Sequence, residues 1–335
     1  MALNFSFYND AEEEEWDKFV LEKSMNGIFL QTRKFINYHP KGKFKDSSIC
    51  VRKGNELVAV ILGCELDDGG KMFFAHRGST FGGITLSKTI YSAASIDELI
   101  SGFLAFLREN GFKKCFLKMV PTIYQKKQAE LVDYFLHKNN FYCYNELNYY
   151  LDLNNYKDDI LAQFTANKRR DYRYSLKNDL SFKELLTKEE IAEYYEVLLK
   201  NLKKLNLNPV HTYEELCDLK FNRFNENVEF YGVFKDNKMI AGSMLFYFNN
   251  DIVHTQYLSS DEEYLSMFPM DFLIYNLIKV GVDKNKKIFS FGICTEDRGK
   301  YLNLGLSRFK EGFGTDFCIN KSYEIELKEE EISNV

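Results

Sequence analysis

Several side chains in the C-terminal half of the chain could move protons. His211 stands in a proline-containing loop, and an imidazole titrates near neutral pH. His254 and Gln256 are expected on one face of a strand and Tyr257 on the other, because side chains alternate along a strand. Asp271 falls in the first turn of an expected helix, where the helix dipole stabilises a carboxylate with or without catalysis. Each residue taken alone is more often incidental than catalytic, so these are candidates for general acid–base chemistry.

The segment from Ser259 to Asp271 has an order of elements that suits an anion. An apolar strand leads into it, and a helix is expected to begin at Pro269. Free backbone N–H groups and the positive end of the helix dipole then face the loop. A diphosphate such as that of coenzyme A is a suitable ligand for this loop. Nearly every strand–loop–helix connection has this geometry, so a plain connection remains the alternative.

A second group of polar residues lies in a glycine-rich stretch of the N-terminal half. His76, Arg77 and Thr80 stand there beside Gly78 and Gly82. Glycine lets the backbone approach a ligand closely, so a polar substrate, including a phosphorylated one, could bind at this stretch. A turn with one surface arginine explains the same residues equally well.

Basic residues crowd a short helix expected at about 160–178. Arg169, Arg170, Arg173 and Lys177 recur at intervals of three and four, hence on one helix face. Such a face could hold phosphate or carboxylate through bidentate arginine bonds. A solvated helix between two domains is the plainer interpretation.

Composition narrows the class of protein. The 335 residues carry a net charge of −5, which argues against wholesale binding to nucleic acid. No apolar run reaches the ~18 residues that a membrane helix needs, and the N-terminal residues are acidic where a signal peptide is basic. Seven scattered cysteines, none in a CxxC pair, fit a reducing compartment without structural zinc or disulfides. We therefore expect a cytoplasmic protein that binds no metal.

Common catalytic signatures are missing from the chain. It contains no GxxxxGK[ST], GxGxxG, GxSxG or HExxH segment. Nucleoside triphosphatases, dinucleotide oxidoreductases, serine hydrolases and zinc proteases therefore lose their usual markers.

The chain repeats one pattern of elements. Residues 51–63 read against residues 233–245, an offset of 182. In both copies a further apolar run follows, then a loop, a helical stretch, a buried strand (114–121 and 287–294), another helical stretch and a closing strand. A duplication of this size predicts two similar α/β domains, which we place at 1–155 and 156–335.

Several segments resemble the FemAB-type branch of the GNAT-like acyltransferases. The most specific is Phe309-Lys-Glu-Gly-Phe-Gly314 after Asn303-Leu-Gly-Leu306. The others are Ser79-Thr-Phe-Gly-Gly83, Lys118-Met-Val-Pro-Thr-Ile-Tyr124, Lys168-Arg-Arg-Asp-Tyr-Arg173, Pro209-Val-His211, Gln256-Tyr257 and Phe289-Ser-Phe-Gly-Ile293. The resemblance covers nearly the whole chain. It implies two tandem GNAT-like domains, each a mixed, mostly antiparallel sheet flanked by helices, with the acceptor in the first and the acyl donor in the second.

The resemblance also implies an activity and a set of site residues. The activity is transfer of an acyl group, with acetyl expected, from coenzyme A to an amine on a cell-envelope or polysaccharide precursor. Lys310 matches the family lysine that stabilises the oxyanion. His211 is the first choice of base and Asp271 the second, while Tyr257 protonates the leaving thiolate. The expected donor-binding residues are Leu258, Ser259, Ser260, Met267, Phe268 and Asn303. The expected acceptor-binding residues are His76, Arg77, Thr80, Lys118, Tyr124, Arg170, Arg173 and Gln256.

Two other functions stay open. Aminoacyl-tRNA could replace coenzyme A, as in the branch that builds peptidoglycan cross-bridges, and the basic helix favours that donor. A catalytically degenerate module that binds a saccharide or a protein is the other. The chain departs from the usual diphosphate loop of GNAT proteins, because Ser260-Asp-Glu-Glu-Tyr264 is acidic where that loop is rich in Gly and Gln or Arg.

Overall fold

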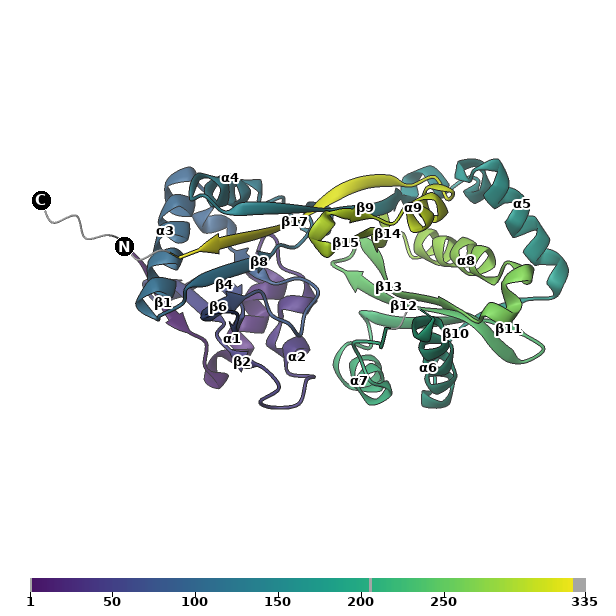
Figure 1. Cartoon of the computed structure of the whole chain (residues 1–335), viewed down its shortest axis with the longest axis horizontal. Coiled ribbons are helices and arrows are strands. Elements are labelled where there is room, and N and C mark those ends of the chain that lie inside the picture. The colour runs from purple at the N-terminus through teal and green to yellow at the C-terminus, as the bar shows by residue number, and fades with distance from the viewer. Residues whose placement is uncertain (1, 205–206, 328–335) are drawn as a thin grey trace, which may run out of the picture. The chain divides into compact units, whose positions relative to one another are not determined.

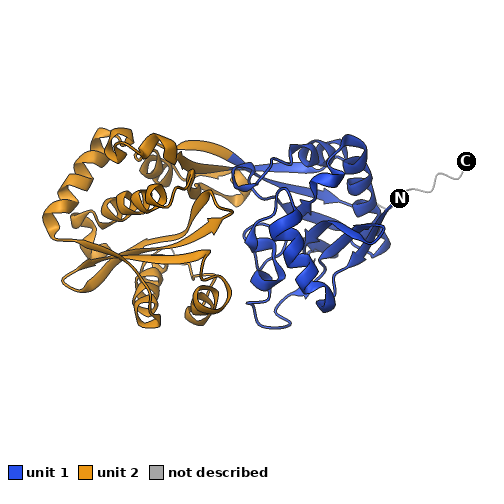
Figure 2. Cartoon of the chain, turned by 180° about the vertical axis from the view of Figure 1, so that it is seen from behind, with its two compact units in different colours: residues 1–146, 319–335 blue, residues 147–318 orange. Residues whose placement is uncertain are grey.

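The computed structural model describes residues 2–204 and 207–327 (Figure 1). The chain forms two compact units, one from residues up to Glu146 and from Ile319 onward, the other from Leu147–Cys318 (Figure 2). The sequence assigns everything after residue 155 to the second domain. In the structure the closing strand β17 (Asp316–Glu326) instead passes into the first unit, so that unit is completed by residues from the end of the chain.

The first unit contains two sheets. One is antiparallel, in the order β1 (Leu3–Phe7), β3 (Ile49–Lys53), β4 (Glu56–Leu62) and β7 (Gly83–Leu86). The other runs β2 (Lys45–Asp46), β5 (Cys64–Asp67), β6 (Lys71–Phe74), β8 (Lys114–Lys118) and β17. The apolar runs on either side of Lys53-Gly54-Asn55 predict a hairpin, and β3 and β4 form it, with Gly54 at a positive φ of 62° in its turn.

Helices cover these sheets. α1 (Glu13–Lys18) continues into a π turn (Phe19–Lys23), and α2 (Arg33–Ile36) lies beside α1. α3 (Ala93–Glu109) and α4 (Glu130–Lys138) pack together, and their apolar faces join β3, β4 and β8 in one core. Leucine, isoleucine and phenylalanine at helical spacing form the buried stripe of α3.

The second unit is built around one sheet. Its order is β10 (Ser181–Glu184), β11 (Val228–Lys235), β12 (Lys238–Phe248), β13 (Ile252–Ser260), β14 (Ile288–Ile293) and β9 (Tyr142–Asp152). Only the β13–β14 pair is parallel among these described strands. Two short strands, β15 (Thr295–Glu296) and β16 (Tyr301–Leu302), form a separate hairpin.

The helices of the second unit lie on both faces of this sheet (Figure 1). α8 (Pro269–Asp283) packs on β11 to β14 and contacts α5 (Ala166–Ser175). α6 (Lys188–Lys203) packs on β12 and β13 from the opposite face, beside α7 (Tyr213–Asp218). α9 (Leu304–Glu311) precedes β17. The helix start at Pro269 and the capping box at Thr212 are as the sequence predicts.

The two units share one topology, as the internal repeat predicts. β6 pairs in parallel with β8 over three positions (Met72 to Phe74), and β13 pairs in parallel with β14 over three positions (Ile252 to His254). Further along, β7 pairs with β4, as the end of β13 pairs with β12. The region that is one continuous strand in the second unit is thus β6 and β7 in the first, interrupted by residues 75–82. The fold is two similar α/β domains in tandem.

The core beneath α8 should be sensitive to truncation. Leu277 is fully buried in it, so Leu277→Ala should lower the free energy of unfolding by about 2–5 kcal/mol through lost burial and a cavity. Leu304 is 57% exposed, and Leu304→Ala is the matched control, expected within about 0.5 kcal/mol of the parent. Urea unfolding followed by circular dichroism measures both. Equal effects would contradict the assignment of α8 to the core.

Candidate active site

The two central strands of the second unit separate after a short parallel pairing. Their pairing ends at His254 and Ser290 within the described chain, and β13 and β14 diverge from there (Figure 1). Each strand carries an extra residue just beyond that point, Gln256 in the β12–β13 ladder and Phe291 in the β14–β9 ladder. A bulge bends the strand that carries it, so the two strands are bent apart at the same level. Within the described residues, β13 and β14 form no ladder with each other beyond this point.

Lys310 from α9 contacts the end of β14, just beyond the point where its pairing with β13 ends. Its side chain is buried, at 3% exposure, and Nζ donates to the carbonyl oxygens of Phe291, Gly292 and Ile293 at 2.9, 3.0 and 2.9 Å. An ammonium group has three protons, and each has a carbonyl partner here. Burial lowers the pKa of Lys310, while nearby Cys294 opposes this shift. Lys310 therefore stabilises the bulged end of β14.

A buried histidine stands at the fork of the two strands. The His254 ring lies 3.4 Å, through Nδ1, from the Ser290 hydroxyl, and Gly292 N–H donates to the same hydroxyl at 3.2 Å. Gly292 has a positive φ of 74°, and a Cβ there would lie 3.4 Å from the His254 ring. Burial, with a smaller contribution from the Lys310 charge, lowers the pKa of His254 to about 3. The imidazole is neutral at physiological pH.

His211 and Tyr257, which the sequence analysis names as separate candidates, are in contact. His211 Nδ1 and the Tyr257 hydroxyl lie 2.8 Å apart, although 46 residues separate them in the chain. The Tyr195 hydroxyl donates to the His211 carbonyl at 3.2 Å and fixes the loop. Burial raises the pKa of Tyr257 to about 12, so the phenol keeps its proton at neutral pH. A protonated phenol bonded to an imidazole can give one proton and recover another.

Asp271 is held by a cation in this structure. Its carboxylate accepts from Lys168 Nζ at 2.8 Å, and both side chains are largely buried. Lys168 Nζ also lies 4.4 Å from the centre of the Phe309 ring. Burial raises the pKa of Asp271, and Lys168 opposes that shift. The pair joins α5, α8 and α9.

The loop between β13 and α8 is acidic, and lysines surround it. Asp261 accepts from Lys200 at 3.0 Å, while Glu262 and Glu263 lie 3.5 Å from Lys204 and 3.7 Å from Lys238. Asp261 also caps the short 3-10 helix that follows. These carboxylates occupy the part of the fold in which the sequence predicted a diphosphate.

The other predicted donor-side residues, except Asn303, lie in or beside the same loop. Ser259 and Ser260 are buried at the end of β13, and Leu258 and Met267 are half-buried. Phe268 has a positive φ of 53° and stacks on Tyr174 with 5.9 Å between ring centres. Asn303 caps α9 by accepting from Leu306 N–H at 3.0 Å. Their binding roles stay predictions.

The predicted acceptor-side residues are dispersed. In the second unit Gln256 is the bulge residue of β13, while Arg170 and Arg173 are exposed on α5, with Arg170 bonded to neighbouring Asp171. In the first unit His76 lines a cavity, Arg77 is exposed, and Thr80 and Lys118 are half-buried. Tyr124 is fully buried and packs against Phe81. These roles likewise stay predictions.

The sequence analysis does not identify several residues that contact Lys310 or His254 or that anchor α9. Ser290, Cys294 and Gly292 lie in or beside the predicted strand, and their importance comes from contacts with Lys310 and His254. Tyr149 from β9 lies 2.6 Å from the Ser307 hydroxyl and donates to Glu311 at 3.1 Å, which anchors α9. The glycine in the motif Phe289-Ser-Phe-Gly-Ile293 was the one available signal.

Two searches of the described residues bear on cofactors and location. Within 2–204 and 207–327, no three His, Cys, Asp or Glu side chains come together in a way that would hold a metal ion. In the same part of the chain, no helix has both the length and the apolar character needed to cross a bilayer.

Comparison with known proteins gives a fold. No protein-family model matches the chain, and no curated protein matches it. Solved structures do match. FemX superposes with a TM-score of 0.69 at 12% identity, over 96% of this chain and 97% of that one. The C-terminal domain of a protein described as a lysylphosphatidylglycerol synthetase, from Agrobacterium fabrum, gives 0.60 at 13% identity, over 94% and 92%. A tandem GNAT protein from the clavulanic acid biosynthesis pathway gives 0.57 at 12% identity, over 98% and 100%.

These likenesses establish a FemAB/GNAT-like fold, as the sequence predicted. Identities of 12–13% carry the fold and no more. At the coarse level the fold is one found in transferases.

Acid should destabilise the second unit through His254. The folded pKa is lowered to about 3 from the ordinary 6.5, so the unfolded state takes up the proton first. This stability is present above pH 6.5 and is lost as the pH falls toward 3, by up to about 1.4 kcal/mol per pH unit. Urea unfolding at a series of pH values between these limits measures the slope.

The control for this slope is an exposed histidine. His254→Gln should reduce the pH dependence by about one proton, whereas His137→Gln should leave it unchanged, because His137 is exposed at the end of α4. An unchanged slope in His254→Gln would mean that the imidazole is accessible to protons in the folded state.

Proposed function

We propose that this protein is an N-acyltransferase whose reaction takes place where β13 and β14 diverge. The observation that carries the proposal is the pair of bulges at Gln256 and Phe291, with Lys310 bonded to three successive carbonyl groups behind them. Where two neighbouring strands stop pairing, an extended donor arm can bond to backbone groups that the ladder leaves unpaired.

The proposed reaction joins an amine to the acyl carbon of a thioester. The amine nitrogen attacks the carbonyl carbon, a C–N bond forms, the C–S bond breaks, and the thiol leaves. Tyr257 gives its proton to the leaving sulfur. The proton that the amine loses returns to the pair of His211 and Tyr257, so the pair is restored after each turnover. The distance of 2.8 Å between His211 Nδ1 and the Tyr257 hydroxyl supports this exchange.

Lys310 has a defined place in this scheme. Its three protons all bond to backbone carbonyls, so it positions the Phe291–Ile293 segment. Stabilising an oxyanion as well requires that one of these carbonyl bonds be exchanged for the developing negative charge. We assign the proton transfers to His211 and Tyr257 and not to Asp271, because Lys168 engages the Asp271 carboxylate.

The finer proposal follows the sequence analysis. The acyl group is acetyl, the donor is acetyl coenzyme A, and the acceptor is an amine on a cell-envelope or polysaccharide precursor. Leu258 to Ser260 at the end of β13 are the nearest candidates to hold the donor arm, since they follow the bulge directly.

Removing the phenol should slow transfer. Tyr257→Phe should lower kcat by about 100-fold while leaving KM for the donor nearly unchanged, because a general acid acts in the transition state. Tyr301→Phe is the control, since Tyr301 is exposed on β16 and should retain parent activity. The assay follows thiol release from acetyl coenzyme A with a panel of amines. If Lys310→Met and His211→Ala, both folded by circular dichroism, retain full rates, the assignment of the site is wrong.

One observation favours the second candidate donor, an aminoacyl-tRNA. The loop at Asp261 to Glu263 is acidic, whereas α5 exposes Arg170 and Arg173, and the 3-10 turn that follows it exposes Lys177. A tRNA donor would bind through such cations, and its leaving atom would be an ester oxygen in place of sulfur.

Salt dependence separates the two donors. If the donor is coenzyme A, acetyl coenzyme A should raise the melting temperature. If the donor is tRNA, the affinity for tRNA should fall steeply with salt concentration. Arg170→Gln combined with Arg173→Gln should then reduce the slope of log affinity against log salt concentration by about two. Lys53→Gln with Lys88→Gln is the charge-matched control, because both lysines are outside α5. A chain that binds neither donor would be a degenerate binding module.

A further inference from the structure

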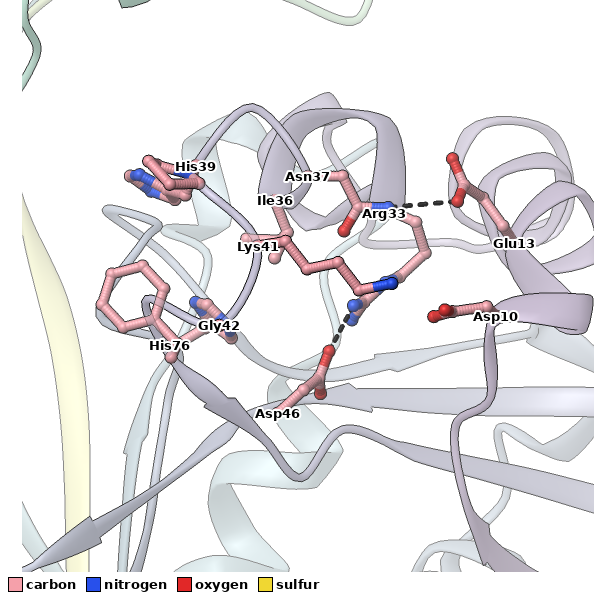
Figure 3. Close-up of a pocket in the computed structure, with 12 residues that line it drawn as sticks. Asp10, Glu13, Arg33, Ile36, Asn37, His39, Lys41, Gly42, Asp46 and His76 are labelled. Carbon is pink, nitrogen blue, oxygen red and sulfur yellow. Dashed lines mark hydrogen bonds and ion pairs between the residues drawn. The ribbon is translucent and has the colours of Figure 1, made fainter.

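The first unit contains an open cavity of about 420 Å³ (Figure 3). Its wall is formed by the loop after α2, the start of α1, strand β2 and the residues after β6. The lining is mostly polar, and the side chains used below are Asp10, Glu13, Arg33, Lys41, Asp46 and His76. Its size suits a small organic ligand.

The one buried cation of this cavity is already neutralised by the protein. Arg33 is 3% exposed and forms an ion pair with Asp46, and NH1 donates to the Ser48 hydroxyl at 3.2 Å. The guanidinium also lies 4.0 Å from the centre of the Tyr8 ring. Burial raises the pKa of Asp46, but Arg33 and Ser48 outweigh that effect and the pKa is lowered. Arg33 is thus a structural part of the cavity floor and not a free site for an anion.

His76 offers a hydrogen-bond donor from the cavity wall. The residue is 1% exposed, and Gly78 N–H donates to its Nδ1 at 3.0 Å. Since Nδ1 accepts, the proton of the neutral ring is on Nε2. Within the described part of the chain, Nε2 bonds to no other group. A buried N–H group without a hydrogen-bond partner is unfavourable. This N–H group lies beside the cavity, so an oxygen atom of a ligand there could accept its hydrogen bond.

The charges that remain for a ligand are mainly negative. With Arg33 and Asp46 paired, the other charged side chains are Asp10, Glu13 and Lys41, and the five together carry a net charge of −1. Glu13 accepts from Asn37 at 3.0 Å, and Asp10 projects toward the Lys41 side (Figure 3). Phe44 adds an aromatic wall whose ring centre is 4.9 Å from that of His76.

We propose that this cavity binds a small, oxygen-rich primary amine, with its ammonium group at Asp10 and Glu13 and an oxygen atom at His76 Nε2. Two carboxylates make charge-assisted hydrogen bonds to an ammonium group. An aromatic wall contacts the carbon skeleton of such a ligand. The proposal differs from the sequence analysis, which allows a phosphorylated and hence anionic ligand near His76. It rests on the first unit alone and stands whether or not the second unit transfers acyl groups.

The topology supports a ligand site at this position. Between β6 and β7 the chain leaves the sheet over residues 75–82. The N–H of Ala75 still donates to the Phe116 carbonyl, and the N–H of Gly82 donates to the Lys118 carbonyl where the chain returns. His76 is the first residue of the excursion after Ala75. It therefore stands two positions beyond the last parallel pair (Phe74 with Phe116), as Gln256 stands two positions beyond His254 in the second unit. Both copies depart from a regular strand at the same place.

The test is isothermal titration of the full chain with three related probes. Glucosamine and glucose differ only in the amino group, and glucose 6-phosphate carries an anion in place of the cation. Glucosamine should bind at least about ten times more tightly than glucose. Asp10→Asn combined with Glu13→Gln should weaken glucosamine binding about tenfold or more and leave glucose nearly unchanged.

A matched variant and a conservative one complete the test. Glu14→Gln combined with Glu22→Gln changes the net charge equally at exposed positions outside the cavity, and should bind glucosamine as the parent does. His76→Gln keeps an N–H donor and should retain more affinity than His76→Ala, with thermal unfolding showing that both are folded. The proposal is overturned if none of the probes binds, if glucose or glucose 6-phosphate binds as well as glucosamine, or if the carboxylate variants bind like the parent.

Discussion

The bonds from Lys310 to three successive carbonyl groups are the interaction on which the second unit's site depends. Without a cation, the carbonyls of Phe291, Gly292 and Ile293 would lie close together and partly out of water, which is unfavourable. The ammonium group satisfies them at once and so keeps β14 bent away from β13. Tyr149 bonds to Ser307 and Glu311 and so holds α9 where Lys310 can bond to these carbonyl groups.

The duplication then explains why the two proposed sites lie at corresponding points of the two sheets. Each unit has a parallel strand pair that ends after three positions. In both units a strand departs from regular geometry just beyond that pair. In the second unit the departure is a single residue, Gln256, and the strand continues. In the first it is the excursion 75–82, which adds His76 to a cavity wall. Both proposed sites thus lie just beyond the end of a parallel strand pair.

The sequence predicted the elements well where periodicity was long. The β3–β4 and β11–β12 hairpins, α3, α6 and α8 all follow from apolar spacing and turn residues. Short strands such as β10 and β16 carry too few residues for a period and were not predicted. The alternation expected for His254, Gln256 and Tyr257 does not hold, because a bulge inserts one residue and resets the faces. Bulges depend on the partner strand, which sequence alone does not specify.

Site residues could be guessed by type but not by partner. His211 and Tyr257 are distant in sequence, as are Lys168 and Asp271, and each meeting depends on the completed fold. The partner decides the chemistry: a carboxylate held by lysine is a clamp, whereas an imidazole bonded to a phenol can exchange protons. The same argument applies to Arg33, because its pairing with Asp46 neutralises the buried guanidinium that would otherwise suggest an anionic ligand. Charge type in a sequence therefore predicts ligand charge only after the internal pairs are known.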